Sequence, residues 1–304
     1  MRPGRHCDEG IALVSVLWVL VLLSSVAGAT VLAARTNATV SRNLIDTSST
    51  RNLAEGAVHL AVLNLYRADA GRWKGDGTRH RLSVGDTSVD VSAVNESGKV
   101  DLNFATAEML RRLLTAAGAD DKRALEIASA ILDWRDPDDL HRLNGAEARA
   151  YKSRRLDYGP ANANFDSVEE LQYVLGMDRV LFDKLRPSIT VHSGQAGINL
   201  AAATPLVLWA ISNLSKDSDG DVTALPEKVL QEYSRAAIAR SINRNFIARV
   251  PGNVYSVMAE ATSGSGAVAR ISAIVRLEPG FGHSPFRILA WNTQAAEQKP
   301  EASP

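Results

Sequence analysis

The sequence has little of what thiol enzymes and metal-binding folds require. Its 304 residues include one cysteine, Cys7, so no disulfide can form within the chain, and zinc ribbons and thiol enzymes are excluded. The six histidines show no H-E-x-x-H or other close ligand spacing. The 34 basic and 34 acidic side chains cancel, so the chain lacks the overall positive field of a dedicated nucleic-acid binder.

Motifs of common enzyme classes are also missing. The sequence contains no G-x-S-x-G, P-loop or G-x-G-x-x-G pattern. We therefore predict that the chain is not an enzyme. A hydrolase that uses Asp133 and Asp136 as paired carboxylates is the alternative, and it would lose turnover when either is replaced. The length and the 45% hydrophobic content predict about two domains with a buried core.

The amino-terminal region carries one long apolar run. No side chain from Gly10 to Ala34 is ionisable, and Ile11 to Leu23 is almost purely aliphatic. At about 1.5 Å per residue, a helix over this run can cross a hydrocarbon core of about 30 Å. Arg2 and Arg5 precede the run, so the excess of Lys and Arg predicts a cytoplasmic amino end and an exported body.

A short polar leader ends in Gly10 immediately before the apolar run. This arrangement resembles the site that prepilin peptidases cut in type IV pilins and pseudopilins. The resemblance implies a mature protein that begins at Ile11 and keeps its apolar helix. Signal peptidase cleavage after 27–29 or 33–34, where small residues form A-x-A-like sites, is the alternative.

Ser15 occupies the fifth position after the expected cleavage. Pilin-like subunits usually carry Glu there, and its carboxylate neutralises the amino terminus of a neighbouring subunit inside the apolar filament. An uncompensated charge at that depth costs at least a few kcal/mol. Ser15 therefore predicts a subunit that starts a filament at its tip and does not join beneath another. The alternative is an ordinary membrane anchor in which Ser15 has no assembly role.

The exported body alternates between strand and helix patterns. Residues 35–66 continue the anchor as an amphipathic helix, and two short strands are expected up to Val94. Leu, Ala, Arg and Glu then recur at helical spacing, and Ser167 with Glu170 forms a capping box. Strands are expected at 188–191, 253–262, 267–277 and 286–291, the middle two joined by a Ser-Gly-Ser-Gly hairpin connector.

These patterns predict an α+β fold. A long amino-terminal helix packs on a small antiparallel sheet, and a large helical (SAM-like) insertion interrupts the sheet domain. Residues 100–106 and 198–204 form a weak repeat, each leading into a helix. The expected division is a leader (1–10), a transmembrane or filament-core helix (11–34), a pilin-like domain in two parts (35–100 and 188–293), a helical insertion (101–187) and a disordered tail (294–304).

The densest acidic cluster runs from Asp133 to Asp139 and is followed by Glu147. Oxygen ligands on a loop with Pro and Gly suit calcium, which accepts six to eight oxygens in flexible geometry. The spacing does not match an EF-hand. Composition alone favours a solvated acidic loop over a calcium site, and both interpretations stay open at this point.

The helical section also resembles helix-hairpin-helix units that bind DNA. Its cations, which would contact phosphates, are Arg111, Arg112, Lys152, Arg154 and Arg155. Asp120, Asp121 and the acidic loop would repel phosphate, so a solvated helix face is favoured and no nucleic acid is expected as a partner. A membrane-anchored DNA-binding or uptake protein remains the alternative function, and it would show salt-dependent DNA binding.

Five segments together resemble the minor pseudopilin K family of type II secretion systems. They are the leader with Gly10 before the apolar run, and the segments 100–103, 130–136, 144–151 and 165–171. Their order is quite specific, and the resemblance extends from Gly10 to about Trp291. Members of that family also lack the fifth-position Glu, which agrees with Ser15.

The resemblance implies a structural role at the tip of the pseudopilus, where the protein initiates and caps the filament for protein export. It implies minor pseudopilins I and J, pseudopilins H and G, the prepilin peptidase and the inner-membrane secretion platform as partners. It also implies a single-pass inner-membrane protein with a periplasmic body and a methylated amino terminus. The helical domain of that family can bind calcium, and the residues implied as ligands are Asp133, Asp136, Asp138, Glu147 and Asn164. Ala148 stands where family members often have another acidic residue.

Overall fold

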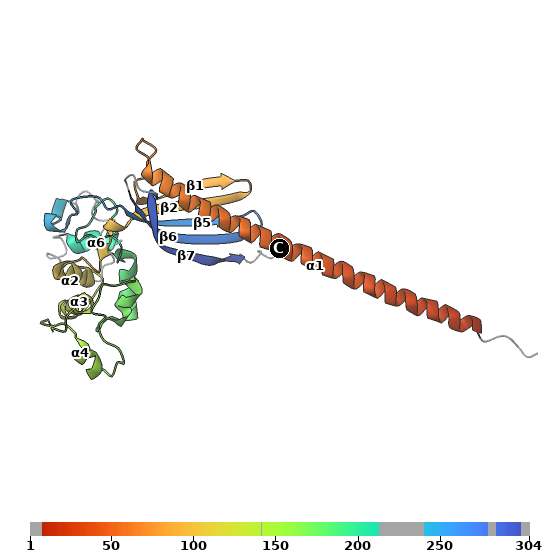
Figure 1. Cartoon of the computed structure of the whole chain (residues 1–304), viewed down its shortest axis with the longest axis horizontal. Helices are drawn as coiled ribbons and strands as arrows, with labels where there is room; N and C mark the ends of the chain where they lie inside the picture. Colours follow the sequence, from red (N-terminus) through yellow and green to blue (C-terminus); the bar gives the residue numbers. More distant parts are fainter. Residues whose placement is uncertain (1–7, 141, 213–239, 279–283, 299–304) are drawn as a thin grey trace, which may run out of the picture.

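The computed structural model describes residues 8–140, 142–212, 240–278 and 284–298. Its largest element is a 59-residue helix, α1 (Asp8–Tyr66). One part of α1 lies across a sheet and the other projects far beyond the body, while a group of shorter helices lies at the opposite end of the sheet (Figure 1). The fold is α+β with a long amino-terminal helix on an antiparallel sheet, which confirms the predicted class.

Five antiparallel strands form the sheet in the order β1-β2-β5-β6-β7. They are β1 (Asp76–Val84), β2 (Thr87–Asn95), β5 (Val254–Thr262), β6 (Ala267–Leu277) and β7 (Phe286–Gln298). In β2, β5 and β6, buried residues alternate with more exposed ones, because successive side chains of a strand point to opposite faces. Ser88 of β2 pairs with Thr262 of β5, so a strand from before the helical residues lies beside one from after them.

Small and aliphatic side chains join α1 to the sheet. Ala54, Ala57, Val58, Ala61 and Leu65 recur at three- and four-residue intervals and are buried against the strands. On the sheet, the residues that complete this core include Val91, Ala259, Ile271 and Val275. Alanine at the centre of the helix stripe allows the helix to lie close to the strands.

The sheet extends further toward the carboxyl terminus than the sequence predicts. The predicted closing strand ends at residue 291 and the disordered tail begins at 294, whereas β7 continues to Gln298. Gln294 pairs with Arg270, and Gln298 pairs with Ala267. The pairing adds backbone hydrogen bonds that a polar composition does not reveal. Residues 299–304 lie outside the described part of the chain.

A second hydrophobic core belongs to the helical unit. Its helices are α2 (Ala107–Ala116), α3 (Asp121–Arg135), α4 (Ala148–Ser153), α5 (Arg179–Leu185) and α6 (Pro205–Ile211). Short 3-10 turns are η1 (Glu96–Gly98), η2 (Val168–Tyr173), η3 (Arg186–Ser188) and η4 (Arg244–Phe246). β3 (Val100–Asp101) and β4 (Ile189–Thr190) form a parallel pair.

Threonine caps begin two of these helices at the two copies of the weak repeat. Thr106 accepts a hydrogen bond from the Met109 N–H at the start of α2, and Thr204 accepts one from the Val207 N–H at the start of α6. The predicted capping box is also present, because the Glu170 carboxylate accepts from the Ser167 N–H at 2.9 Å. It begins the 3-10 turn η2 and not an α-helix.

The helical core extends beyond the predicted boundary at residue 187. Ile198, Val207, Trp209 and Phe246 belong to the same hydrophobic cluster as α2 and α3. The sheet resumes only at Val254. We therefore propose a helical unit that runs from about residue 100 to about residue 248, in place of the division at 187. Residues 213–239 lie outside the described residues.

Candidate anchor helix and cation site

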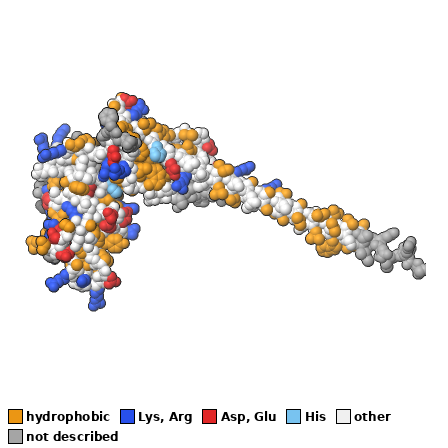
Figure 2. Space-filling model, in the orientation of Figure 1, with side chains coloured by type: hydrophobic (Ala, Val, Ile, Leu, Met, Phe, Trp, Pro, Cys, Tyr) orange, Lys and Arg blue, Asp and Glu red, His pale blue; other side chains and the backbone are white. Residues whose placement is uncertain are grey.

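The outer part of the projecting α1 exposes an apolar surface, which runs from Leu13 to about Leu32. Among the described residues, one helix, Leu13–Tyr66, is long and apolar enough to cross a membrane. Leu13 and Trp18 are 68% and 66% exposed, and Leu44 is still 66% exposed. Hydrophobic side chains cover the outer part of the projecting helix (Figure 2). A helix with this surface is stable only in lipid or against other apolar helices.

The predicted processing and assembly residues lie at the outer end of this helix. Gly10 and Ile11 are within α1, and Ser15 follows about one turn later on its exposed surface. The outer end of α1 lies far from the sheet and from the helical unit (Figure 1). Cleavage after Gly10 and an assembly role for Ser15 stay predictions.

The acidic loop is built around Asp133, near the end of α3. Its side chain is fully buried, and its Oδ2 accepts a hydrogen bond from the Ala146 N–H at 2.8 Å. A Cβ at Gly145 would lie 2.0 Å from the same oxygen, so only glycine allows the loop to pass this close. Asn144 has a positive φ of 66°, which turns the chain back toward α3. The loop thus wraps around one buried carboxylate.

Arg142 joins two of the predicted ligands. Its Nε lies 3.1 Å from Asp133 Oδ1, and its Nη2 donates to Asp136 Oδ2. The Arg142 side chain is 47% exposed, whereas Asp136 is 15% exposed. The hydrogen bond to Asp136 raises the pKa of Arg142. The guanidinium therefore supplies positive charge to the aspartates from the solvent side.

Several buried oxygens of the loop have no hydrogen-bond partner. They are Oδ1 of Asp133, Oδ1 of Asp136, both carboxylate oxygens of Glu147 and Oδ1 of Asn162. Glu147 is only 6% exposed, and burial together with the nearby aspartates raises its pKa. Burial also raises the pKa of Asp133. Asp133 and Asp136 also contact Arg142, whereas neither oxygen of Glu147 has a hydrogen-bond partner. A buried carboxylate of that kind is costly, so the chemistry of this set suits a cation.

The arrangement differs in part from the ligand set that the resemblance implies. Asp138 is exposed and its Oδ1 accepts from the Leu140 N–H, and Asn164 is also exposed. Asn162 instead has its Oδ1 buried, while its Nδ2 donates to Asp139. Its positive φ of 49° was not visible in the sequence, where the two asparagines look equivalent. Asp138 and Asn164 stay predictions as ligands.

The carboxylates are not gathered into a formed metal site. In the described part of the chain, no three His, Cys, Asp or Glu side chains are placed together so that they could hold a metal ion. Unpartnered oxygens nevertheless come from the end of α3, from the residue that precedes α4 and from Asn162. The donor chemistry therefore suits calcium, and the oxygens must move closer together to bind it.

The geometry argues against the hydrolase alternative, and it engages two of the five cations named for DNA binding, while Lys152, Arg154 and Arg155 are exposed. Asp133 is fully buried and Arg142 contacts both aspartates, so the pair is poorly placed to activate water for hydrolysis. Arg111 pairs with Glu108 and Asp121, and Arg112 is buried and also pairs with Glu108. These two arginines are thus engaged within the unit and not presented to a phosphate backbone.

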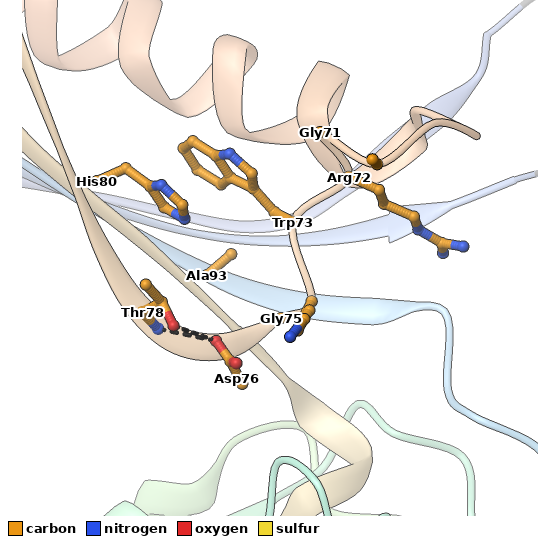
Figure 3. A pocket seen from close by; sticks show the side chains of 10 residues that line it. Gly71, Arg72, Trp73, Gly75, Asp76, Thr78, His80 and Ala93 are labelled. Atoms are coloured by element: carbon orange, nitrogen blue, oxygen red, sulfur yellow. Dashed lines mark hydrogen bonds between the residues drawn. The ribbon is translucent and has the colours of Figure 1, made fainter.

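A hollow of about 310 Å³ lies where the chain leaves α1. Trp73 stacks on His80 with ring centroids 3.8 Å apart, and Figure 3 shows the two rings side by side. Asp76 accepts from the Thr78 N–H and hydroxyl at 3.0 and 2.6 Å, and these bonds lower the pKa of Asp76. Asp76 thus holds the turn into β1, and the hollow offers no convergent set of free ligand groups that we can assign.

Comparison with known proteins connects these features to a secretion apparatus. A family model described as type II secretion system (T2SS), protein K matches residues 88–194. This part of the chain is therefore similar to protein K of type II secretion systems. This segment covers β2, the start of the helical unit and the acidic loop, and the match confirms the resemblance seen in the sequence.

Two curated relatives carry the same name. Type II secretion system protein K of Klebsiella pneumoniae is 29% identical over 206 residues, which is 61% of this chain and 63% of the relative. The protein K of Dickeya chrysanthemi is 32% identical over 128 residues, 41% of this chain and 34% of that protein. This chain thus spans less than two thirds of the length of these relatives in the matched regions. Neither relative is named as an enzyme.

A solved structure shares the fold of the whole body. It is a chain from the GspK–GspI–GspJ complex of the enterotoxigenic Escherichia coli type 2 secretion system, with a TM-score of 0.55 and 18% identity. The match covers 86% of this chain and 99% of that chain. A chain of that complex therefore has a similar fold over most of the length of this chain.

Proposed function

We propose that this chain is a minor pseudopilin at the tip of a type II secretion pseudopilus. The observation that carries the proposal is the position of the helical unit at the end of the sheet opposite the projecting part of α1 (Figure 1). A filament grows by packing α1-type helices side by side, each subunit displaced along the axis from its neighbour. The bulky helical unit would overlap the place of any subunit stacked above, so the chain initiates and caps the filament.

Ser15 supports the same position in the filament. A subunit at the tip has no neighbour above it whose charged amino terminus it must neutralise. Its own Ile11 amine, after cleavage following Gly10, would be available to the carboxylate of the next subunit below. The apolar surface of α1 would then leave the bilayer and pack on equivalent helices with little change of environment.

The partners follow from this role. The similar solved chain comes from a complex with GspI and GspJ, which supports minor pseudopilins I and J as the neighbours of this chain. Pseudopilins H and G, the prepilin peptidase and the inner-membrane secretion platform are proposed as further partners of assembly. We place α1 in the bacterial inner membrane and the body in the periplasm.

The tip position is tested by labelling. Sheared pseudopili are purified from cells in which the chain carries an exposed epitope after residue 304, and they are imaged with gold-conjugated antibody. We expect label at one end of each filament. Label spaced along the shaft contradicts the proposal, and the same epitope on the major subunit serves as the control for antibody access. Amino-terminal sequencing of the extracted chain checks for a start at Ile11.

We further propose that the acidic loop binds calcium. The buried oxygens of Glu147, Asp136 and Asn162 that lack hydrogen bonds support the site, together with the buried carboxylate of Asp133, which Arg142 contacts. Asp138 and Asn164 are additional candidates from the sequence. A bound calcium ion would neutralise the carboxylates and link the end of α3 to the start of α4. Asp133 organises the loop through Ala146, and Gly145 allows the close approach.

The calcium proposal is tested by titration calorimetry on the detergent-solubilised chain stripped with a chelator. We expect one calcium-dependent binding event that magnesium does not reproduce, because magnesium requires a smaller octahedral site. Asp133→Asn should abolish the event. Glu169→Gln is the matched control, since Glu169 is an exposed carboxylate of the same unit and pairs with Arg186 away from the loop. Equal binding by Asp133→Asn and the wild type contradicts the site.

A further inference from the structure

The carboxylates of Asp133 and Asp136 contact a cation that belongs to the chain itself, the guanidinium of Arg142. Arg142 approaches Asp133 with Nε at 3.1 Å and donates to Asp136 through Nη2. Asp133 and Asp136 are 0% and 15% exposed, so the guanidinium covers carboxylates that have little water around them. Arg142 is itself carried on the loop, three residues before Gly145, whose N–H donates to the Arg142 carbonyl.

The guanidinium of Arg142 and a metal ion would compete for the same carboxylates. Glu147 stays buried with both oxygens unpartnered, while Arg142 takes one oxygen of each aspartate. No three of the described carboxylates form a metal-binding arrangement. A divalent cation drawn to the same carboxylates would be repelled by the guanidinium, and Arg142 must swing toward solvent for all the oxygens to converge. Its 47% exposed side chain leaves room for that movement.

We propose that Arg142 is a built-in counter-cation, which holds the acidic loop together when no metal is present and lowers the affinity of the loop for calcium. This inference rests on the calcium site proposed above. It predicts two effects of opposite direction when the charge is removed. The metal-free protein becomes less stable, because the carboxylates lose their neutralising partner, while calcium binds more tightly, because its competitor is gone.

The size of the change in affinity follows from Coulomb's law. A guanidinium and a divalent ion that share a set of carboxylates repel each other enough, even in a water-like dielectric, to change a dissociation constant by about tenfold. Screening by salt reduces the difference, since Arg142 is partly exposed. We therefore expect Arg142→Gln to bind calcium about tenfold more tightly at low ionic strength, with a smaller gain at high salt.

The experiment compares four forms of the full chain in detergent after removal of metal with a chelator. They are the wild type, Arg142→Gln, Arg142→Lys and the control Arg179→Gln, which removes an exposed ion pair with Asp183 on α5. Titration calorimetry with calcium chloride gives the affinity, and thermal unfolding followed by circular dichroism gives the metal-free stability. Far-ultraviolet spectra verify that each variant is folded before titration.

Tighter calcium binding by Arg142→Gln alone, with a lower metal-free unfolding temperature than Arg179→Gln, supports the proposal. Equal or weaker binding by Arg142→Gln overturns it and leaves the calcium site in place, because Arg142 would then be organising the ligands. Binding by Arg142→Lys as tight as that of Arg142→Gln overturns the charge argument. Absence of calcium binding in both the wild type and Arg142→Gln overturns the calcium site itself, and the inference with it.

Discussion

Replacing Gly145 by alanine tests how the acidic loop is held. The new Cβ would lie 2.0 Å from Asp133 Oδ2 and 2.7 Å from Asp133 Cγ, whereas real contacts of this kind are essentially never under 3.0 Å. Asp133 cannot retreat into solvent, because its side chain is fully buried. Either the carboxylate rotates or the loop moves away. In both cases the hydrogen bond from the Ala146 N–H to Asp133, now 2.8 Å, is lost.

The magnitude follows from that bond. A hydrogen bond to a charged group contributes about 1.5–3 kcal/mol to the free energy of unfolding. In a domain of about 150–250 residues, each kcal/mol lowers the unfolding temperature by about 2–4 °C. We therefore expect Gly145→Ala to lower the unfolding temperature by about 3–12 °C, and to weaken any calcium binding by the loop.

Thermal unfolding of the full chain in detergent, followed by circular dichroism at 222 nm, measures the change. Gly159→Ala is a suitable control, because its Cβ would meet only Ala148 atoms at an ordinary 3.6 Å. We expect the control to stay within about 0.5 kcal/mol of the wild type, as most substitutions without a structural cause do. An equal unfolding temperature for Gly145→Ala and Gly159→Ala would refute the reasoning that glycine is required by the approach to Asp133.

Three further substitutions test other parts of the molecule. Glu147→Gln should raise the stability of the metal-free protein, because its carboxylate has a raised pKa from burial and nearby aspartates. A carboxyl whose pKa is higher in the folded state favours folding as pH falls, so the wild type should gain stability relative to Glu147→Gln between pH 7 and 5. Unfolding curves at the two pH values measure the difference in stability between Glu147→Gln and the wild type. A wild type that is the more stable form at pH 7 would disprove the prediction. Thr106→Ala should cost about 1 kcal/mol through loss of the α2 cap, measured by denaturant unfolding, and Thr106→Ser should restore most of it. Ala61→Leu should cost about 1–3 kcal/mol, because Ala61 is fully buried on the face of α1 that packs against the sheet. An unchanged unfolding midpoint would contradict that packing.

The fold was largely predictable where a pattern stayed local. The apolar run from Ile11 and the later stripe of Ala57, Ala61 and Leu65 predict one long helix, because no proline or loop signal interrupts them before Tyr66. Apolar and polar side chains alternate from 267 to 277, and this local pattern predicts β6. The extension of β7 to Gln298 was not predictable, since a polar strand edge depends on hydrogen bonds to β6 and leaves no hydrophobic pattern.

Other parts of the fold depend on contacts between residues far apart in the chain, and the sequence did not predict them. The parallel pair of Val100 with Ile189 joins positions far apart in the chain and is only two residues long on each side, so no periodic signal marks it. The helical core includes Phe246 because of tertiary packing that residue type alone does not specify.

The acidic loop was identified from composition, but its details were not. Asn162 differs from Asn164 only in the backbone turn that buries its oxygen, and the role of Arg142 depends on how the loop folds back onto α3. The one sequence signal for Arg142 is a basic residue set among several acidic ones.

The uninterrupted course of α1 has a mechanical consequence. A helix of 59 residues without proline is about 90 Å long and behaves as a stiff rod, with no hinge between the apolar segment and the sheet. Sideways tilting by about 10° at the outer end displaces the opposite end by about 15 Å on this geometry. A force along the axis of α1 is therefore transmitted to the strands, because no flexible joint lies between them. The orientation of the sheet and the helical unit is therefore set by the contacts that hold the outer segment of α1.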